Sequence, residues 1–196
     1  MKIERVYREV LYRFFEENNH EFKVRQLAKE CKVSIGLVSY ALRPLKRMGA
    51  VQVYRRRFEI LDAWKIMLYW CSMRNLWRDV IYKNRIDLSV DQIERFLPPG
   101  SKLTAYTGFK FRFGYVPADY GEVIVYGFRE EFERRFGEEK YARMPNLIVL
   151  RIDEHLKKFD RVPLPQIYVD LWNLGTWYAR EFLIKLENHL RELGRR

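Results

Sequence analysis

Residues 24–51 read VRQLAKECKVSIGLVSYALRPLKRMGAV, and this stretch decides the fold of the N-terminal part of the chain. Its apolar residues recur at helical spacing on both sides of a short break. Leu27 and Ala28 belong to a first short helix, which we expect to end around Cys31-Lys32-Val33. Ser34 stands where the N-cap of a second helix is expected, because its hydroxyl can accept a hydrogen bond from a backbone amide. The stretch therefore predicts two consecutive helices joined by a tight turn.

The second predicted helix has one apolar face and one polar face. Val38, Leu42 and Leu45 recur at spacings of four and three, which places them on a single buried stripe. Gly49 follows the helix where a left-handed glycine commonly ends one. The opposite face suits the base edges of a DNA major groove better than a protein core: Ile35, Gly36, Ser39, Tyr40, Arg43 and Arg47. This pattern predicts a helix-turn-helix that binds duplex DNA.

Positive charge is concentrated on the same segment. From Lys23 to Arg57 the chain carries ten Lys and Arg and one acid, Glu30, so that ten minus one leaves +9, whereas all 196 residues sum to +11. Scattered basic residues would indicate an ordinary solvated surface. A basic cluster on a helix-turn-helix favours a polyanionic partner, because phosphate neutralisation supplies most of the non-specific affinity for DNA.

The flanking segments predict a winged helix. An apolar stripe predicts that the chain opens with an amphipathic helix: Ile3, Tyr7, Val10 and Phe14. Residues 21–23 are expected to be extended. Residues 51–54 and 58–61 alternate in polarity like the two strands of a hairpin, with Arg55, Arg56 and Arg57 at its tip.

The rest of the chain predicts a second domain with mixed secondary structure. Asp62 caps an apolar helix that runs to about Leu76. Beyond it, strands are expected near residues 79–86, 103–108, 122–126 and 147–152, and helices near 89–97, 129–136, 166–174 and 177–193. His155 is expected in a surface loop, exposed to solvent. The predicted class is α+β, with a winged helix at 1–61, a connecting helix at 62–77 and a mixed α+β domain at 78–196.

Composition limits the remaining possibilities. A hydrophobic content of 48% and an aromatic content of 16% exclude a disordered chain. Cys31 and Cys71 lack CxxC spacing, so we expect a reducing compartment, no metal and no cofactor. The most apolar window, residues 63–73, is about half the length that crosses a bilayer, which predicts a cytoplasmic protein without a membrane partner. Abundant Lys, Arg and Glu with only four Gln is typical of thermophiles.

Two parts of the chain resemble known regulators. Ser34, with Val38 four residues later and Gly49-Ala50-Val51 after the helix, is similar to winged-helix transcription factors of bacteria and archaea. The second half resembles the C-terminal domain of AbiEi-type regulators, which are the antitoxins of type IV toxin–antitoxin systems, in TAYTG (104–108), VIVY (123–126) and VPLPQIYVDLW (162–172).

The AbiEi resemblance spans nearly the whole chain and departs from the family at residues 109–115, where aromatic and basic side chains replace small ones. It implies a nucleotidyltransferase toxin as a partner. Nucleotidyl transfer itself requires a Gly-Ser step and paired carboxylates for Mg²⁺. Gly100-Ser101 is present, but residues 102–118 contain no acid and Asp119 stands alone. We therefore expect no enzymatic activity from this chain.

The leading hypothesis is a transcriptional regulator that binds specific promoter sequences. Ser39, Tyr40 and Arg43 are expected to reach base edges, and Arg43 is the best candidate for a bidentate contact with guanine. The hairpin tip is expected to enter an adjoining minor groove. Arg25, Lys46 and Arg47 are expected to contact phosphates. The remaining predicted site residues, at the start of the recognition helix, are Ser34, Ile35 and Gly36.

Two other functions stay open: an antitoxin-like protein that opposes a toxin, and a module that binds basal transcription machinery or RNA. A homodimer is also expected. The apolar helix at 63–76 and the C-terminal helix ending at Leu193 offer more apolar surface than a monomer usually exposes.

Overall fold

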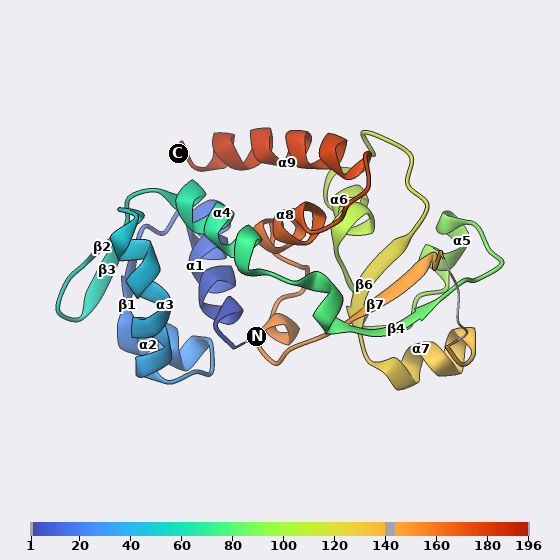
Figure 1. Ribbon diagram of the computed structural model, residues 1–196, viewed down its shortest axis with the longest axis horizontal. Helices are drawn as coiled ribbons and strands as arrows, with labels where there is room; N and C mark the ends of the chain where they lie inside the picture. The colour runs from blue at the N-terminus through green and yellow to red at the C-terminus, as the bar shows by residue number, and fades with distance from the viewer. Residues whose placement is uncertain (1, 140–143, 196) are drawn as a thin grey trace. The chain divides into compact units, whose positions relative to one another are not determined.

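The computed structural model describes residues 2–139 and 144–195 and is an α+β protein, as the sequence predicts (Figure 1). The chain divides into two compact units. Unit 1 comprises Met1–Arg74, Pro163–Val169 and Glu187–Arg196, and unit 2 comprises Asn75–Val162 and Asp170–Leu186. This division does not coincide with the predicted boundaries at residues 61 and 77. It keeps the connecting helix in unit 1 and shares the last two helices, α8 (Leu164–Trp172) and α9 (Ala179–Leu193), between the units.

Unit 1 begins with three helices: α1 (Glu4–Glu17), α2 (Val24–Glu30) and α3 (Ile35–Arg47). The predicted local signals are present. The Ser34 hydroxyl accepts a hydrogen bond from the Leu37 amide at 3.1 Å, which caps α3. Gly49 is left-handed with φ of 68°, and Lys32 turns the chain between α2 and α3 with φ of 52°. Helix α3 continues through Pro44 to Arg47, although proline removes one backbone donor.

A three-stranded antiparallel sheet in the order β1-β3-β2 packs with these helices: β1 (Glu21–Lys23), β2 (Val51–Val53) and β3 (Arg57–Ile60). The buried rings of Phe22 and Phe58 face each other across β1 and β3, with 5.2 Å between centroids. Arg57 was predicted at the hairpin tip, and this position is wrong. The Tyr54 amide donates a hydrogen bond to the Arg57 carbonyl oxygen at 2.8 Å. Arg57 is therefore the first residue of β3, and the loop of the hairpin ends at Arg56, one residue earlier than predicted.

Helix α4 (Ala63–Met73) completes the contiguous part of unit 1. Asp62 caps it as predicted, accepting from the Lys65 amide at 3.0 Å. The helix ends three residues before the predicted Leu76, because Arg74 is extended and a short 3-10 helix, η1 (Leu76–Asp79), follows. Trp70 of α4 is completely buried, and its indole nitrogen donates to the Glu4 carboxylate of α1 at 3.1 Å.

Unit 2 is built on a four-stranded sheet in the order β4-β7-β6-β5: β4 (Val80–Asn84), β5 (Lys102–Leu103), β6 (Val123–Gly127) and β7 (Leu147–Arg151). Strands β6 and β7 are parallel, and the other pairs are antiparallel. All residues of β6 are buried, so both faces of the sheet are covered. Val125 packs on one face with Phe132 of α7 (Arg129–Phe136) and Ile93 of α5 (Val90–Arg95).

The strand predicted at residues 103–108 is wrong beyond Leu103. Helix α6 (Ala105–Phe113) begins two residues later, and the Gly108 amide bonds the Thr104 carbonyl at 2.9 Å. Residues 104–109 are all buried. When every side of a segment is covered, the alternation of polar and apolar residues no longer reports which face is inside. The apparent strand pattern of TAYTG therefore carried no information about its conformation.

The exposed position predicted for His155 is also wrong, since only 1% of this residue is accessible. Asp153 accepts hydrogen bonds at 2.8 Å from the backbone amides of His155 and Leu156. The resulting turn leads into the 3-10 helix η2 (Leu156–Lys158), and the imidazole packs edge-on against Phe159. Within residues 2–139 and 144–195, no helix is both long and apolar enough to span a bilayer.

Candidate nucleic-acid interface

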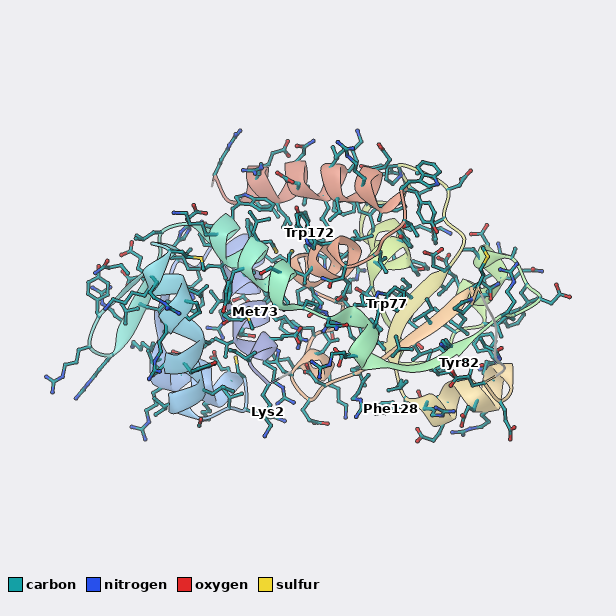
Figure 2. The ribbon with its side chains drawn as sticks, viewed as in Figure 1. Lys2, Met73, Trp77, Tyr82, Phe128 and Trp172 are labelled. Atoms are coloured by element: carbon teal, nitrogen blue, oxygen red, sulfur yellow. The ribbon has the colours of Figure 1, made fainter. Side chains whose placement is uncertain are left out.

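A groove of about 610 Å³ lies in unit 1 between the exposed face of α3, the start of α2 and the β2–β3 hairpin. Seven of the twelve predicted site residues line it: Arg25, Ile35, Ser39, Arg43, Lys46, Arg55 and Arg56. The structure therefore brings together residues that are up to 31 positions apart in the sequence, from Arg25 to Arg56. In Figure 2, side chains that end in nitrogen extend from the hairpin loop into solvent.

The buried face of α3 determines which side chains reach this groove. Val38, Ala41 and Leu45 are at most 1% exposed and fix the rotation of the helix about its axis. Ile35, Ser39, Arg43 and Lys46 then follow one another at spacings of three or four along the exposed side. Since the burial of one stripe sets the direction of the other, the apolar pattern of α3 also positions the candidate site.

Three predicted residues lie on the outer edge of the same exposed face rather than in the groove. Gly36, Tyr40 and Arg47 are exposed, and Tyr40 retains 59% of its accessible surface. The groove and this edge together form the surface that we call the α3 face.

Ser34 lines a different hollow, of about 530 Å³. Three lysines that the sequence did not predict as site residues line the same hollow: Lys2, Lys29 and Lys32. In the sequence, Lys29 and Lys32 were considered only as two of the ten Lys and Arg between residues 23 and 57. Their grouping with Lys2 could not be read from spacing, because Lys2 belongs to a distant part of the chain. The basic surface of unit 1 therefore extends beyond the α3 face.

The part of the chain that the structure describes does not neutralise the groove cations. No acidic side chain in the described ranges forms an ion pair with any of five exposed residues: Arg25, Arg43, Lys46, Arg55 and Arg56. The nearby acid Glu30 pairs instead with Arg13 of α1 at 2.7 Å. Positive charge at the groove is therefore available to an anionic ligand.

Arg57 differs from its two neighbours. Its guanidinium lies 2.5 Å from the Glu21 carboxylate and 4.4 Å from the centre of the Tyr54 ring. The hydrogen bond and charge of Glu21 raise the pKa of Arg57. Of the three arginines predicted for the hairpin tip, Arg57 has an acidic partner, whereas Arg55 and Arg56 have none within residues 2–139 and 144–195.

Apolar residues form the floor of the groove. Most of them were not among the site residues that the sequence predicted. Leu42 is 4% exposed, and Val24 and Val53 are half-buried, whereas the cations around them are exposed. Tyr54 adds an aromatic side from the hairpin. Leu42 was predicted only as core. No helical periodicity could have linked it with Val53, because the two come from different elements.

Unit 2 contains two carboxylates with several protein donors. Asp170 is completely buried and accepts from the Thr104 and Tyr126 hydroxyls at 2.7 and 2.6 Å. Glu94 accepts from Thr107, Lys110 and Tyr120 at 2.5 to 2.9 Å. These bonds connect α5, α6, α8 and β6 of unit 2. They give the two carboxylates a structural role that requires no ligand.

Comparison of the chain with models of protein families, with curated proteins and with solved structures found no match. The resemblance to AbiEi-type regulators accordingly stays a prediction from the sequence. Function must be inferred from the geometry and charge of the α3 face.

Proposed function

We propose that residues 4–61 form a winged-helix domain and that the protein is a transcriptional regulator that binds specific sequences in duplex DNA. One observation carries the proposal: the groove joins the exposed side of α3 to the hairpin, and its five lining cations have no acidic partner among the residues that the structure describes. The order of elements supports the domain type, since α2 and α3 follow β1 and the β2–β3 hairpin follows α3.

In this proposal α3 enters the major groove. A helix with its side chains is about 10–12 Å across, and the major groove of B-DNA is about 12 Å wide. Arg43 lies in the second half of α3, where it lines the groove, and would donate to O6 and N7 of guanine. Arg25 and Lys46 would bind phosphates on either side. Arg55 and Arg56, at the hairpin tip, would enter the neighbouring minor groove.

The dimensions of the major groove favour duplex DNA over helical RNA as the ligand. The major groove of A-form RNA is too deep and narrow for an α-helix, and specific RNA recognition usually uses unpaired bases stacked on aromatic rings. The α3 face presents two exposed rings, Tyr40 and Tyr54, and the Arg57 guanidinium already lies over the Tyr54 ring, 4.4 Å from its centre. No contact in the described residues favours a toxin or a basal transcription factor as the partner.

The proposal does not require a homodimer. The helices that suggested pairing bury most of their apolar residues within a single chain: Ala63, Ile66, Met67 and Trp70 of α4, and Ala179, Phe182, Leu186 and Leu190 of α9. Only Leu68 of α4, which is 46% exposed, and Ile184 of α9, which is 44% exposed, remain as large exposed aliphatic residues on these helices. Light scattering of the free protein and the symmetry of its DNA footprint decide whether two copies pair.

Selection from a random duplex library with the full chain tests the proposal. We expect one sequence motif to be enriched. Binding to the enriched duplex should weaken with salt, with a slope of log K against log salt between about −3 and −5 if the groove cations contact phosphates. Failure to enrich any motif, together with equal affinity for all duplexes, would contradict sequence-specific binding. No binding at low salt would contradict any role for DNA.

A further inference from the structure

The first residue of α3 is apolar and faces the groove. Ile35 keeps 51% of its surface exposed and lines the groove beside Ser39 and Arg43. A single exposed aliphatic side chain is ordinary on a protein surface. Ile35 differs because it lines the same groove as the half-buried apolar side chains of Val24 and Val53.

The next residue, Gly36, has no structural requirement to be glycine. Its φ is not left-handed, and a Cβ added there would meet only the Ser34 hydroxyl oxygen, at 3.8 Å. Glycine in a helix is nevertheless less stable than alanine. What glycine supplies at this position is space, since it lets another molecule approach the backbone of the first turn closely. The residues at the start of a recognition helix are also those that reach base edges in helix-turn-helix complexes.

We propose that the first turn of α3 reads a thymine methyl group: Ile35 packs on the C5-methyl of one thymine, and Gly36 allows the base pair to approach. The proposal rests on the proposed function and adds the chemistry of one base contact. The thymine methyl is the apolar group that base pairs present in the major groove, and every other distinguishing group there is a hydrogen-bond donor or acceptor. An aliphatic side chain among polar ones therefore selects thymine.

Replacement of each thymine in the selected duplex by deoxyuridine, one at a time, tests the proposal. Deoxyuridine lacks only the methyl group. We expect one substitution to weaken binding of the unmodified protein about fourfold, the value for one buried methyl group. The same substitution should have no effect on the Ile35→Ala variant. A 5-methylcytosine at that position should bind more tightly than cytosine, because it restores the methyl group.

Leu61→Ala is the matched control, since Leu61 is similarly exposed at 58% but does not line the groove. This variant should keep the full response to deoxyuridine. If no thymine responds, or if Ile35→Ala responds as strongly as the unmodified protein, the assignment of the methyl contact to Ile35 is wrong. Either result would leave sequence-specific binding by α3 intact, whereas a failure to select any motif would remove the proposed function itself.

Discussion

The Tyr7 hydroxyl of α1 donates a hydrogen bond to the Ala41 carbonyl oxygen of α3, with 3.2 Å between the two oxygens. Both residues are completely buried, and the Tyr7 ring also packs edge-on against Tyr69 of α4. Burial and the neighbouring Tyr69 raise the pKa of Tyr7, so the hydroxyl keeps its proton. Helix α1 thus holds the buried side of α3 by a directional bond, close to Pro44, where the helix lacks one of its own donors.

The variant Tyr7→Phe tests the contribution of this bond to stability. It keeps the ring and removes the donor, so we expect the free energy of unfolding to fall by about 1 kcal/mol. Urea unfolding followed by circular dichroism measures the change. Tyr115→Phe, at a half-exposed tyrosine of unit 2, should have no effect. Equal stability of the Tyr7→Phe variant and the unmodified protein would show that the bond adds nothing beyond ring packing.

The buried carboxylate of Glu4 makes the stability of unit 1 depend on pH. Burial by itself raises the pKa of Glu4, but the charges and donors around the carboxylate together outweigh burial and lower this pKa below its usual value of 4.5. Among them are Arg74, which donates to Glu4 at 2.9 Å, and the Trp70 indole. Because the pKa is lower in the folded chain than in the unfolded one, ionised Glu4 stabilises the fold above about pH 4.5. This stabilisation is lost as the pH falls through the folded pKa.

We therefore expect Glu4→Gln to lower the free energy of unfolding by about 3 kcal/mol near neutral pH, since it removes a charged partner of the buried Arg74. The difference from the unmodified protein should shrink below about pH 4.5. Urea titrations at several pH values measure both effects, and Glu192→Gln, at an exposed position of α9, is the control. A penalty that does not change with pH would mean that the Glu4 charge is not what stabilises the fold.

The variant Gly36→Ala should change the stability of the fold and the affinity for DNA in opposite directions. Alanine fits the backbone of α3 and meets only the Ser34 hydroxyl, so the free energy of unfolding should rise by about 0.5–1 kcal/mol. Affinity for the selected duplex should fall, because the added methyl group occupies space that the base pair needs. Gly175→Ala, where a Cβ would meet no atom within 4 Å, should leave DNA affinity unchanged. A stabilised Gly36→Ala variant that binds DNA normally would remove Gly36 from the interface.

The hairpin arginines should differ in their contribution to DNA affinity. Replacing Arg55 and Arg56 together by alanine should reduce the salt slope by about 0.9 for each phosphate that the variant no longer neutralises. Arg57→Ala should change the slope less, since Glu21 already neutralises Arg57. The double variant Arg134→Ala, Arg135→Ala removes the same charge from α7 in unit 2 and is the matched control. If this control flattens the slope as much as the Arg55 and Arg56 variant, net charge rather than the hairpin explains the effect.

Local signals made most of unit 1 predictable from the sequence. The Ser34 cap, the stripe of Val38, Leu42 and Leu45, and the left-handed Gly49 each depend on residues a few positions apart. The α+β class followed from the same kind of pattern, and so did the helix predicted from residue 89, where the structure has Ser89 capping α5. These features do not depend on what packs against them.

Long-range packing decided the features that the sequence did not predict. His155 is buried by a turn around Asp153, and helix α6 is covered on all sides in its first turns. The groove has the same origin, because its floor combines Leu42 of α3 with Val53 of β2. The sequence identified the charged residues of the candidate site but not the surface that joins them.

Arg43→Ala, measured on the selected duplex and on a scrambled duplex of the same length, tests most directly whether α3 reads DNA sequence. Fluorescence anisotropy at one salt concentration gives both affinities. We expect affinity for the selected duplex to fall by about 1–3 kcal/mol while affinity for the scrambled duplex hardly changes. An equal loss on both duplexes would make Arg43 a phosphate contact, and no loss on either would contradict recognition of DNA by α3.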